Sequence, residues 1–194
     1  MKFILASKSI RRKEILNKIN LNFETFNSKL IEKDIPNNYK KPSSYCKKLA
    51  IMKSKLVAKK FPNHYVIGAD TIVVYDNKIL NKPLNKEEAK SHLNLLSNNK
   101  HIVYTAVSLI NISKNINRSF IEKTIVYFNK LNNKEINNYI TKFKPYDKAG
   151  AYAIQEYSNV FVKKINGCFY NVVGFPLPKF YKLLNNELKL INQL

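Results

Sequence analysis

The stretch from Val66 to Tyr75 restricts the fold more than any other part of the sequence. It is a run of apolar and β-branched residues between polar, turn-forming segments, which is typical of a buried β-strand. One carboxylate, Asp70, lies near its middle. Burying an ionised carboxylate without partners is very costly, so we expect Asp70 to meet a metal, a cation or several hydrogen-bond donors. Gly68 and Ala69 would let a ligand or another backbone approach. The alternative is a strand that ends at Gly68, with Asp70 in a solvated turn.

The length of the chain and its cysteines limit which classes of protein it can belong to. The chain has 194 residues, which predicts one domain over residues 1–194 with a sizeable core. No apolar run approaches the roughly 20 residues of a membrane span, so we expect no membrane association. Cys46 and Cys168 lie far apart and show no metal-ligand spacing. This pattern predicts two reduced thiols and a cytoplasmic protein.

The formal net charge of +21 raises the question of a nucleic-acid partner. The basic residues are nearly all lysines, accompanied by many Asn and Ile residues, as expected from drift toward A/T-rich codons. They are scattered along the chain and do not alternate with aromatic residues in one stripe. The favoured interpretation is therefore a solvated basic surface, with a nucleic-acid groove as the alternative.

Residue types that are rare in this chain gather in a few places. Two of the three arginines are the adjacent pair Arg11 and Arg12. Glycine alone adopts positive φ freely or admits close backbone approach. The chain has four glycines, each in a segment of interest on other grounds: Gly68, Gly150, Gly167 and Gly174. These clusters indicate where a functional site would lie.

The chain opens with a strand, a loop and a helix. Lys2 to Ala6 is expected to be a strand, and a helix is expected from about Ile10 to Lys18. The connection carries Ser7 and Ser9, and the two arginines follow it. Hydroxyl groups, N–H groups at a helix N-terminus and guanidinium groups all suit phosphate. The alternative is an N-cap serine followed by a basic surface helix.

The remaining pattern predicts an alternation of strands and helices. Further strands are expected over about 22–27, 101–111, 119–129 and 160–165, and helices over about 42–60, 86–96, 133–141 and 177–188. A turn at 166–168 leads into the apolar segment 169–173. Ser43 and Ser44 are expected to cap the second helix, and Leu56 to face the core. Asn85 with Glu88, and Asn132 with Glu135, predict caps for the next two helices. Ala149 to Ala151 would form a turn that leaves space for a ligand.

Taken in order, these motifs resemble the Maf family of nucleoside triphosphate pyrophosphatases. The resemblance covers essentially the whole chain and rests on the segments Leu5–Leu16, Gly68–Val73, Lys82–Pro83, Leu95–Ser97, His101 with Val103 and Thr105, Asp147–Gln155 and Asn171–Leu177. The form of the segment from Asp147 to Gln155 resembles the branch acting on dTTP and UTP, as distinct from the 7-methyl-GTP branch.

The resemblance implies a fold and a reaction. The fold would be α/β, with a long, twisted mixed β-sheet flanked by helices and two lobes around a cleft, similar to the inosine triphosphate pyrophosphatases. The reaction would be metal-dependent hydrolysis of dTTP and UTP to the monophosphate and pyrophosphate. The cofactor would be Mg²⁺ or Mn²⁺, and many members form homodimers. The competing interpretations are a 7-methyl-GTP pyrophosphatase, a nucleotide-binding regulator of cell division without turnover, and a nucleic-acid binder.

The resemblance also assigns roles to particular residues. It makes Asp70 the catalytic carboxylate and a metal ligand, together with Glu32, although Asp34 in the same loop is an alternative to Glu32. The expected substrate contacts are Ser7, Arg11, Arg12, Lys53 and Lys82. The expected determinants of base choice are Arg12, Thr71 and Gln155.

The roles in base choice follow from donors and acceptors. Uracil and thymine present two carbonyl acceptors around one N–H donor, a pattern that arginine, threonine and glutamine can satisfy together. Ala153 and Phe169 would add bulk against purines. The departures Lys8, Ile10, Ala153 and Cys168 put the efficiency of catalysis in doubt more than the reaction type.

Overall fold

The computed structural model describes residues 1–32, 35 and 41–188. The elements, in chain order, are β1 (Phe3–Leu5), α1 (Ile10–Asn17), β2 (Phe23–Thr25), α2 (Pro42–Ala58), β3 (Tyr65–Tyr75), β4 (Lys78–Leu80), α3 (Lys86–Leu96), β5 (Lys100–Asn111), β6 (Ile116–Phe128), α4 (Asn133–Phe143), the 3₁₀ helices η2 (Ala149–Ala151) and η3 (Tyr157–Phe161), β7 (Val162–Asn166), α5 (Phe169–Val173) and α6 (Leu177–Leu188). Within these residues, no helix has both the length and the apolar character needed to cross a membrane.

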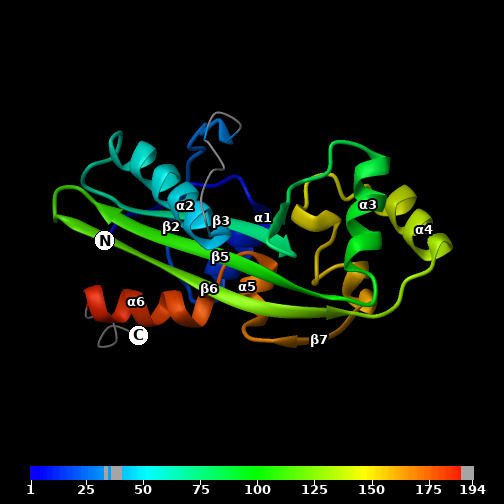
Figure 1. The fold of residues 1–194 in the computed structure, drawn as a ribbon. Coiled ribbons are helices and arrows are strands. Elements are labelled where there is room, and N and C mark those ends of the chain that lie inside the picture. Colours follow the sequence, from blue (N-terminus) through cyan, green and yellow to red (C-terminus); the bar gives the residue numbers. More distant parts are fainter. Residues whose placement is uncertain (33–34, 36–40, 189–194) are drawn as a thin grey trace.

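One mixed sheet organises the described residues. Its order is β2-β1-β3-β5-β6-β7, and β4 pairs with β3 outside this path. β1 runs parallel to β2 and β3, whereas β3, β5, β6 and β7 pair antiparallel. The long strands β3, β5 and β6 form its centre, with α2 above and α6 below in the view of Figure 1. The expected mixed sheet flanked by helices is thus confirmed.

Alternation along β3 explains why this strand lies at the centre. Tyr65 and Ile67 pack on one face with residues of α1 and α6. Ile72 and Val74 pack on the other face with residues of α2. The strand runs without a break through Asp70, which pairs with Ala106 of β5. The alternative of a strand ending at Gly68 is therefore wrong.

Gly68 is the point at which α2 approaches the sheet. A Cβ atom built on Gly68 would lie 2.3 Å from the backbone oxygen of Ala50 and 2.8 Å from Cβ of Ser54. Any side chain at this position would push the helix away from β3. The expectation that glycine admits another backbone is confirmed, and the backbone is that of α2.

The core is divided between the two ends of the sheet. α3 and α4 lie together at the right of Figure 1, where Leu93 and Ile140 share a cluster of buried side chains. α1 and α6 contribute Leu16 and Phe180 to a second cluster near the other end of the sheet. The two clusters correspond to the two expected lobes, and both rest on the same central strands.

One edge of β3 lacks a strand partner along part of its length. The parallel pairing with β1 stops where Leu5 meets Ile67, and the antiparallel pairing with β4 starts where Val73 meets Leu80. Among the described strands, none pairs with residues 68–72 on this edge. Asp70 and Thr71 therefore lie beside the loop that leaves β1.

Several local expectations about helix ends were correct. The capping box of Asn132 and Glu135 is complete, with both hydrogen bonds present. Asp76 and Asn77 both have positive φ, 46° and 58°, in the tight turn between β3 and β4. Asn85 caps α3, but the Glu88 carboxylate accepts from the N–H of Leu84 instead of closing the expected box.

Other local expectations were wrong. The residue before α2 is Lys41, and Ser43 and Ser44 lie inside the first turn because Pro42 occupies its first position. Leu56 is 39% exposed because it lies on the outer side of that helix.

Three further findings concern the last third of the chain. Val160 belongs to η3, and the strand expected from 160 starts only at Val162. The segment Phe169–Val173 is the short helix α5. Gly150 leaves no space for a ligand, because a Cβ atom there would lie 2.9 Å from Cγ1 of Val73.

Candidate active site

A cleft of about 470 Å³ opens beside the unpaired edge of β3. Its walls come from the loop between β1 and α1, the start of α1, the segment after β2, helix α2, Lys82 after β4 and Asp147. Several predicted site residues, from parts of the chain far apart in sequence, line it: Ser7, Arg11, Arg12, Glu32, Lys53 and Lys82. The structure thus brings together most of the residues that the sequence singled out.

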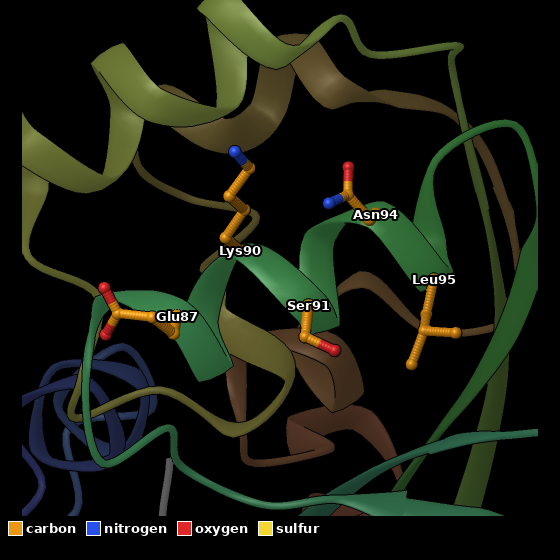
Figure 2. A pocket seen from close by; sticks show the side chains of 5 residues that line it. All are labelled: Glu87, Lys90, Ser91, Asn94 and Leu95. Carbon is orange, nitrogen blue, oxygen red and sulfur yellow. The ribbon is translucent and has the colours of Figure 1, made fainter.

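A second hollow, of about 480 Å³, lies on the outer surface of α3. Figure 2 shows that its labelled side chains all project from this one helix. They are Glu87, Lys90, Ser91, Asn94 and Leu95. None of the predicted site residues is among them. The first cleft is therefore the candidate active site.

Positive charge dominates the candidate cleft. The cationic side chains in its wall are Lys8, Arg11, Arg12, Lys53 and Lys82, against the two carboxylates Glu32 and Asp147. A surplus of cations in a concave site attracts a polyanion and neutralises it once bound. A triphosphate group matches this arrangement.

Lys53 of α2, in the wall of the cleft, contacts two carboxylates. Its Nζ lies 2.5 Å from Oδ1 of Asp70 and 2.7 Å from Oε1 of Glu32. Asp70 is only 5% exposed. The contact depends on the close approach of α2 to β3 at Gly68, which brings the lysine over the strand. The cation expected beside Asp70 is present, and it is a lysine.

The two carboxylates differ in their proton affinity. Burial raises the pKa of Asp70, and the positive charges of Lys53 and Arg12 only partly offset this effect. Burial acts in the same direction on Glu32, but Lys53, Lys82 and Arg12 outweigh it and lower the pKa of Glu32. Asp70 is thus the stronger base of the pair, as a residue that accepts a proton requires.

Asp70 and Glu32 also form a ligand set for a hard divalent cation. Both present carboxylate oxygens to the same ammonium group, so one cation could be shared between them. The described residues contain no cluster of three or more His, Cys, Asp or Glu side chains able to hold a metal. Mg²⁺ is commonly bound by one or two carboxylates plus waters and substrate phosphates. The residues fit such a cation; Asp34, the alternative ligand, lies outside the described residues.

The loop before α1 presents hydrogen-bond donors to the cleft. Oγ of Ser9 caps the helix by accepting from the N–H of Arg12. Oγ of Ser7 accepts from the N–H of Ser9 at 3.2 Å and from Nη1 of Arg12 at 3.3 Å. No acceptor among the described residues takes the hydroxyl proton of Ser7. Together with the N–H groups at the start of α1, this proton suits a phosphate oxygen.

Arg12 connects three segments at the wall of the cleft. Its Nε donates to the carbonyl oxygen of Gly174 at 3.0 Å, and its Nη2 donates to Oγ1 of Thr71 at 3.1 Å. Gly174 has φ of 121°, a conformation that favours glycine and lets its carbonyl face the arginine. The guanidinium group is therefore held in place by the protein before any ligand arrives.

Arg11 has quite different partners. Its Nη1 lies 3.3 Å from Oδ2 of Asp147 and 3.9 Å from Oε1 of Glu156. Asp147 also accepts from Lys148 at 2.7 Å. The sequence analysis assigned Asp147 no role, although it opens the segment from Asp147 to Gln155. Its place in the wall of the cleft makes it a member of the site.

Three predicted roles receive no support from the geometry. Gln155 is exposed, and no hydrogen bond in the described residues joins it to Arg12 or Thr71. Ala153 is buried and exchanges hydrogen bonds with Ser158, outside the wall of the cleft. Phe169 is 43% exposed and also lies outside that wall. The expected obstruction of purines by these two residues is therefore not seen. Of the departures, Lys8 and Ile10 do line the cleft.

Comparison with known proteins shows the family of this chain. The family described as "Maf-like protein" matches residues 2–187. This chain belongs to the Maf-like protein family. The Maf-like chain is 46% identical over 188 residues to a dTTP/UTP pyrophosphatase of Clostridium perfringens, covering 96% of this chain and 97% of that protein. It is 44% identical over 183 residues to a dTTP/UTP pyrophosphatase of Bacillus cereus, covering 94% of each.

Solved structures match the Maf-like chain less closely. The Ham1 protein of Staphylococcus aureus aligns with 15% identity and a TM-score of 0.45, over 66% of this chain and 72% of that one. A dITP/XTP pyrophosphatase of Mycobacterium abscessus aligns with 12% identity and a TM-score of 0.42, over 68% of this chain and 76% of that one.

Proposed function

We propose that this Maf-like protein hydrolyses dTTP and UTP to the nucleoside monophosphate and pyrophosphate, in the cytoplasm and with a divalent cation. The observation that carries the proposal is the buried Asp70, paired with Lys53, which lines a positively charged cleft. The relatives named dTTP/UTP pyrophosphatases supply the substrate class, since they align over nearly the full length of this chain.

Asp70 would act on the attacking water. Hydrolysis between the α- and β-phosphates requires a water molecule to lose a proton as it attacks phosphorus. Burial raises the pKa of Asp70, which makes its carboxylate a stronger base than an exposed one. The positive charges of Lys53 and Arg12 favour its ionised form and so limit this rise. The carboxylate is thus stabilised by neighbouring cations and is more basic than an exposed one.

The triphosphate would lie along the cationic wall of the cleft. The hydroxyl of Ser7 and the N–H groups at the start of α1 can donate to one phosphate, and Arg11 and Lys82 can neutralise others. A triphosphate would compete with Asp147 for Arg11, because both are anions within reach of the same guanidinium group. These groups would also stabilise the charge that develops on the departing pyrophosphate.

Asp70 and Glu32 would hold the divalent cation, Mg²⁺ or Mn²⁺, together with phosphate oxygens. Such a cation supplies charge neutralisation at the reacting phosphates. Lys53, which now joins the two carboxylates, would keep them in position and remain close to the substrate.

A panel of nucleotides tests the proposal directly. The purified protein, with Mg²⁺ or Mn²⁺, is given dTTP, UTP, CTP, dATP, dGTP or 7-methyl-GTP, and pyrophosphate release is measured. We expect the highest kcat/KM for dTTP and UTP, and no release in excess chelator. A higher value for 7-methyl-GTP would assign the chain to the other branch. Binding without release of pyrophosphate would favour a nucleotide-binding regulator.

A second experiment tests the role of Glu32 in holding the cation. Glu32→Ala should raise the concentration of Mg²⁺ or Mn²⁺ needed for half-maximal activity, because one of the two carboxylate ligands is lost. Glu24→Ala, at an exposed position of β2, is the matched control and should leave that concentration unchanged. An unchanged metal requirement in Glu32→Ala would remove Glu32 from the site.

A further inference from the structure

A chain of hydrogen bonds runs from the cleft into the buried sheet. Nη2 of Arg12 donates to Oγ1 of Thr71, which lies 3.0 Å from Oγ1 of Thr105. Oγ1 of Thr105 in turn lies 2.8 Å from the backbone oxygen of Asn171 at α5. Thr71 and Thr105 are direct partners in the pairing of β3 with β5. Arg12 lines the cleft and Thr71 beside it is only partly buried, whereas Thr105 is fully buried and cannot touch a ligand.

The direction of each hydrogen bond in this series follows from counting the protons that each group can donate. A carbonyl oxygen only accepts, so the hydroxyl proton of Thr105 goes to Asn171. A hydroxyl group has one proton, so Thr105 has none left for Thr71. The proton in the 3.0 Å contact between the two threonines must therefore come from Thr71. The other acceptor near Thr71, the oxygen of Gly174, is farther away at 3.4 Å.

Thr71 consequently offers a ligand no proton. Its hydroxyl donates to Thr105 and accepts from Arg12, which leaves one lone pair. The guanidinium group of Arg12 has five N–H donors, of which Ser7, Thr71 and Gly174 each take one. At this point the protein thus presents one acceptor, the hydroxyl oxygen of Thr71, beside the N–H donors of Arg12 that have no protein partner among these three.

We infer that Thr105 is a positioning residue for base choice, which fixes the Thr71 hydroxyl so that it can only accept the N3–H of uracil or thymine. The inference rests on the proposed function and assigns a role to a residue that never meets the substrate. Uracil carries a proton at N3, whereas cytosine carries a lone pair there. The attached sugar and triphosphate would hold the ring in the same place. The lone pair at N3 of cytosine would then face the lone pair of the Thr71 hydroxyl oxygen. The site would then reject CTP through an unpaired buried group.

The decisive variant is Thr105→Val, which keeps the shape of the side chain and removes its hydroxyl. The proton of Thr71 then loses its nearer acceptor, keeps only the oxygen of Gly174 at 3.4 Å, and can turn toward the ligand. We expect kcat/KM to fall for UTP and rise for CTP, so that their ratio decreases by about tenfold or more. Thr105→Ser retains a hydroxyl at this position and should keep the ratio of the wild type.

Thr124→Val is the matched control. Thr124 is also fully buried, and its hydroxyl also anchors α5, by accepting from Nδ2 of Asn171 at 2.9 Å. It makes no hydrogen bond to Thr71 in the described residues. This variant should lower the melting temperature while leaving the ratio of UTP to CTP unchanged. An equal change of the ratio in Thr105→Val and Thr124→Val would mean that loosening of α5 causes it, and would overturn the inference.

A measurement on the unaltered protein does not depend on whether the variants fold. 3-Methyl-UTP lacks the N3 proton, whereas 5-methyl-UTP retains it and carries a methyl group of the same size. We expect hydrolysis of the 5-methyl compound and a loss of about 100-fold or more in kcat/KM for the 3-methyl compound. Equal rates for the two compounds would overturn the inference even though the protein is active. Absence of hydrolysis with every nucleotide would instead contradict the proposed function.

Discussion

At the scale of single residues, burying the Asp70 carboxylate in its ionised form costs folding stability. Burial raises its pKa, so the folded protein binds the proton of this carboxyl group more tightly than the unfolded chain does. Its favourable contribution to stability is therefore complete below the ordinary pKa of aspartate and is lost as the pH rises through the raised value. Ionising the buried carboxylate costs stability, and the positive charges of Lys53 and Arg12 offset part of this cost. Such a cost is typical of catalytic groups.

The variant Asp70→Asn should separate activity from stability. The amide keeps the shape of the side chain but cannot accept a proton from water, so pyrophosphate release should fall to background. The melting temperature near neutral pH should stay equal to that of the wild type or rise, because a buried charge is removed. Asp76→Asn, in the exposed turn after β3, is the matched control and should retain activity. Near-normal turnover in Asp70→Asn would contradict the catalytic role.

At the scale of elements, buried polar contacts tie the loop that carries η2 to the sheet. Nε2 of His101, at the start of β5, lies 2.7 Å from the phenol oxygen of Tyr152. Phe128 of β6 packs edge-on against both rings. Burial lowers the pKa of His101 from 6.5 to about 3, so the imidazole is neutral in the folded protein. The segment that contributes Asp147 to the cleft is thus anchored a few residues later, at Tyr152.

This histidine predicts a pH dependence of stability. Because the folded pKa is lowered, the contribution of His101 is complete above pH 6.5 and is lost as the pH falls toward about 3. Over that window the free energy of unfolding should fall relative to His101→Phe by up to about 1.4 kcal/mol per pH unit. Urea unfolding at a series of pH values measures the difference. Tyr152→Phe, which keeps the titrating imidazole, should retain the pH dependence of the wild type. A constant difference between wild type and His101→Phe would contradict the buried, neutral state.

At the scale of the whole molecule, the net charge of +21 acts in two ways. A diffuse positive field speeds the encounter with any polyanion and weakens as salt is added. Defined cations such as Lys53 and Lys82, in contrast, line one cleft, where they would meet the phosphates of a bound substrate. The two effects can be separated by comparing lysines inside and outside that cleft.

Lys82→Ala should lower kcat/KM for UTP by about 100-fold, at low and at high salt, because a charge that meets the phosphates is removed. Lys86→Ala, at the exposed start of α3 and outside the wall of the cleft, should change it by less than about twofold. The measurement is steady-state kinetics across a salt series. Equal losses in the two variants would show that the diffuse field, and no defined cleft, drives binding.

Much of the secondary structure could be predicted because its causes are local. The capping box at α4 joins residues three apart, and the turn at Asp76 and Asn77 joins neighbouring strands, so both are visible in a short window of sequence. The predictions failed where contacts across the fold outweighed local preference. Val160 has strand propensity but lies in a 3₁₀ helix. Leu56 fits the apolar spacing of α2 but lies on its outer side.

The sequence by itself predicted a buried strand through Asp70 and a close neighbour at Gly68, and it showed that the first loop carries hydroxyl and guanidinium donors. The resemblance to a family then supplied roles for matching positions. Each conclusion depends on residue type and order alone, because alternation, capping and turn chemistry act over a few residues.

Only the tertiary structure decided how these residues act together. It showed that Lys53 joins Asp70 to Glu32, that Asp147 faces Arg11, and that Oγ1 of Thr71 lies 3.0 Å from Oγ1 of Thr105. The partners in these contacts lie up to 136 positions apart in the chain. No local pattern encodes such pairs, because the path of the backbone through the sheet sets which side chains meet. The direction of a hydroxyl proton depends further on every acceptor around it, and those acceptors come from β3, β5 and α5.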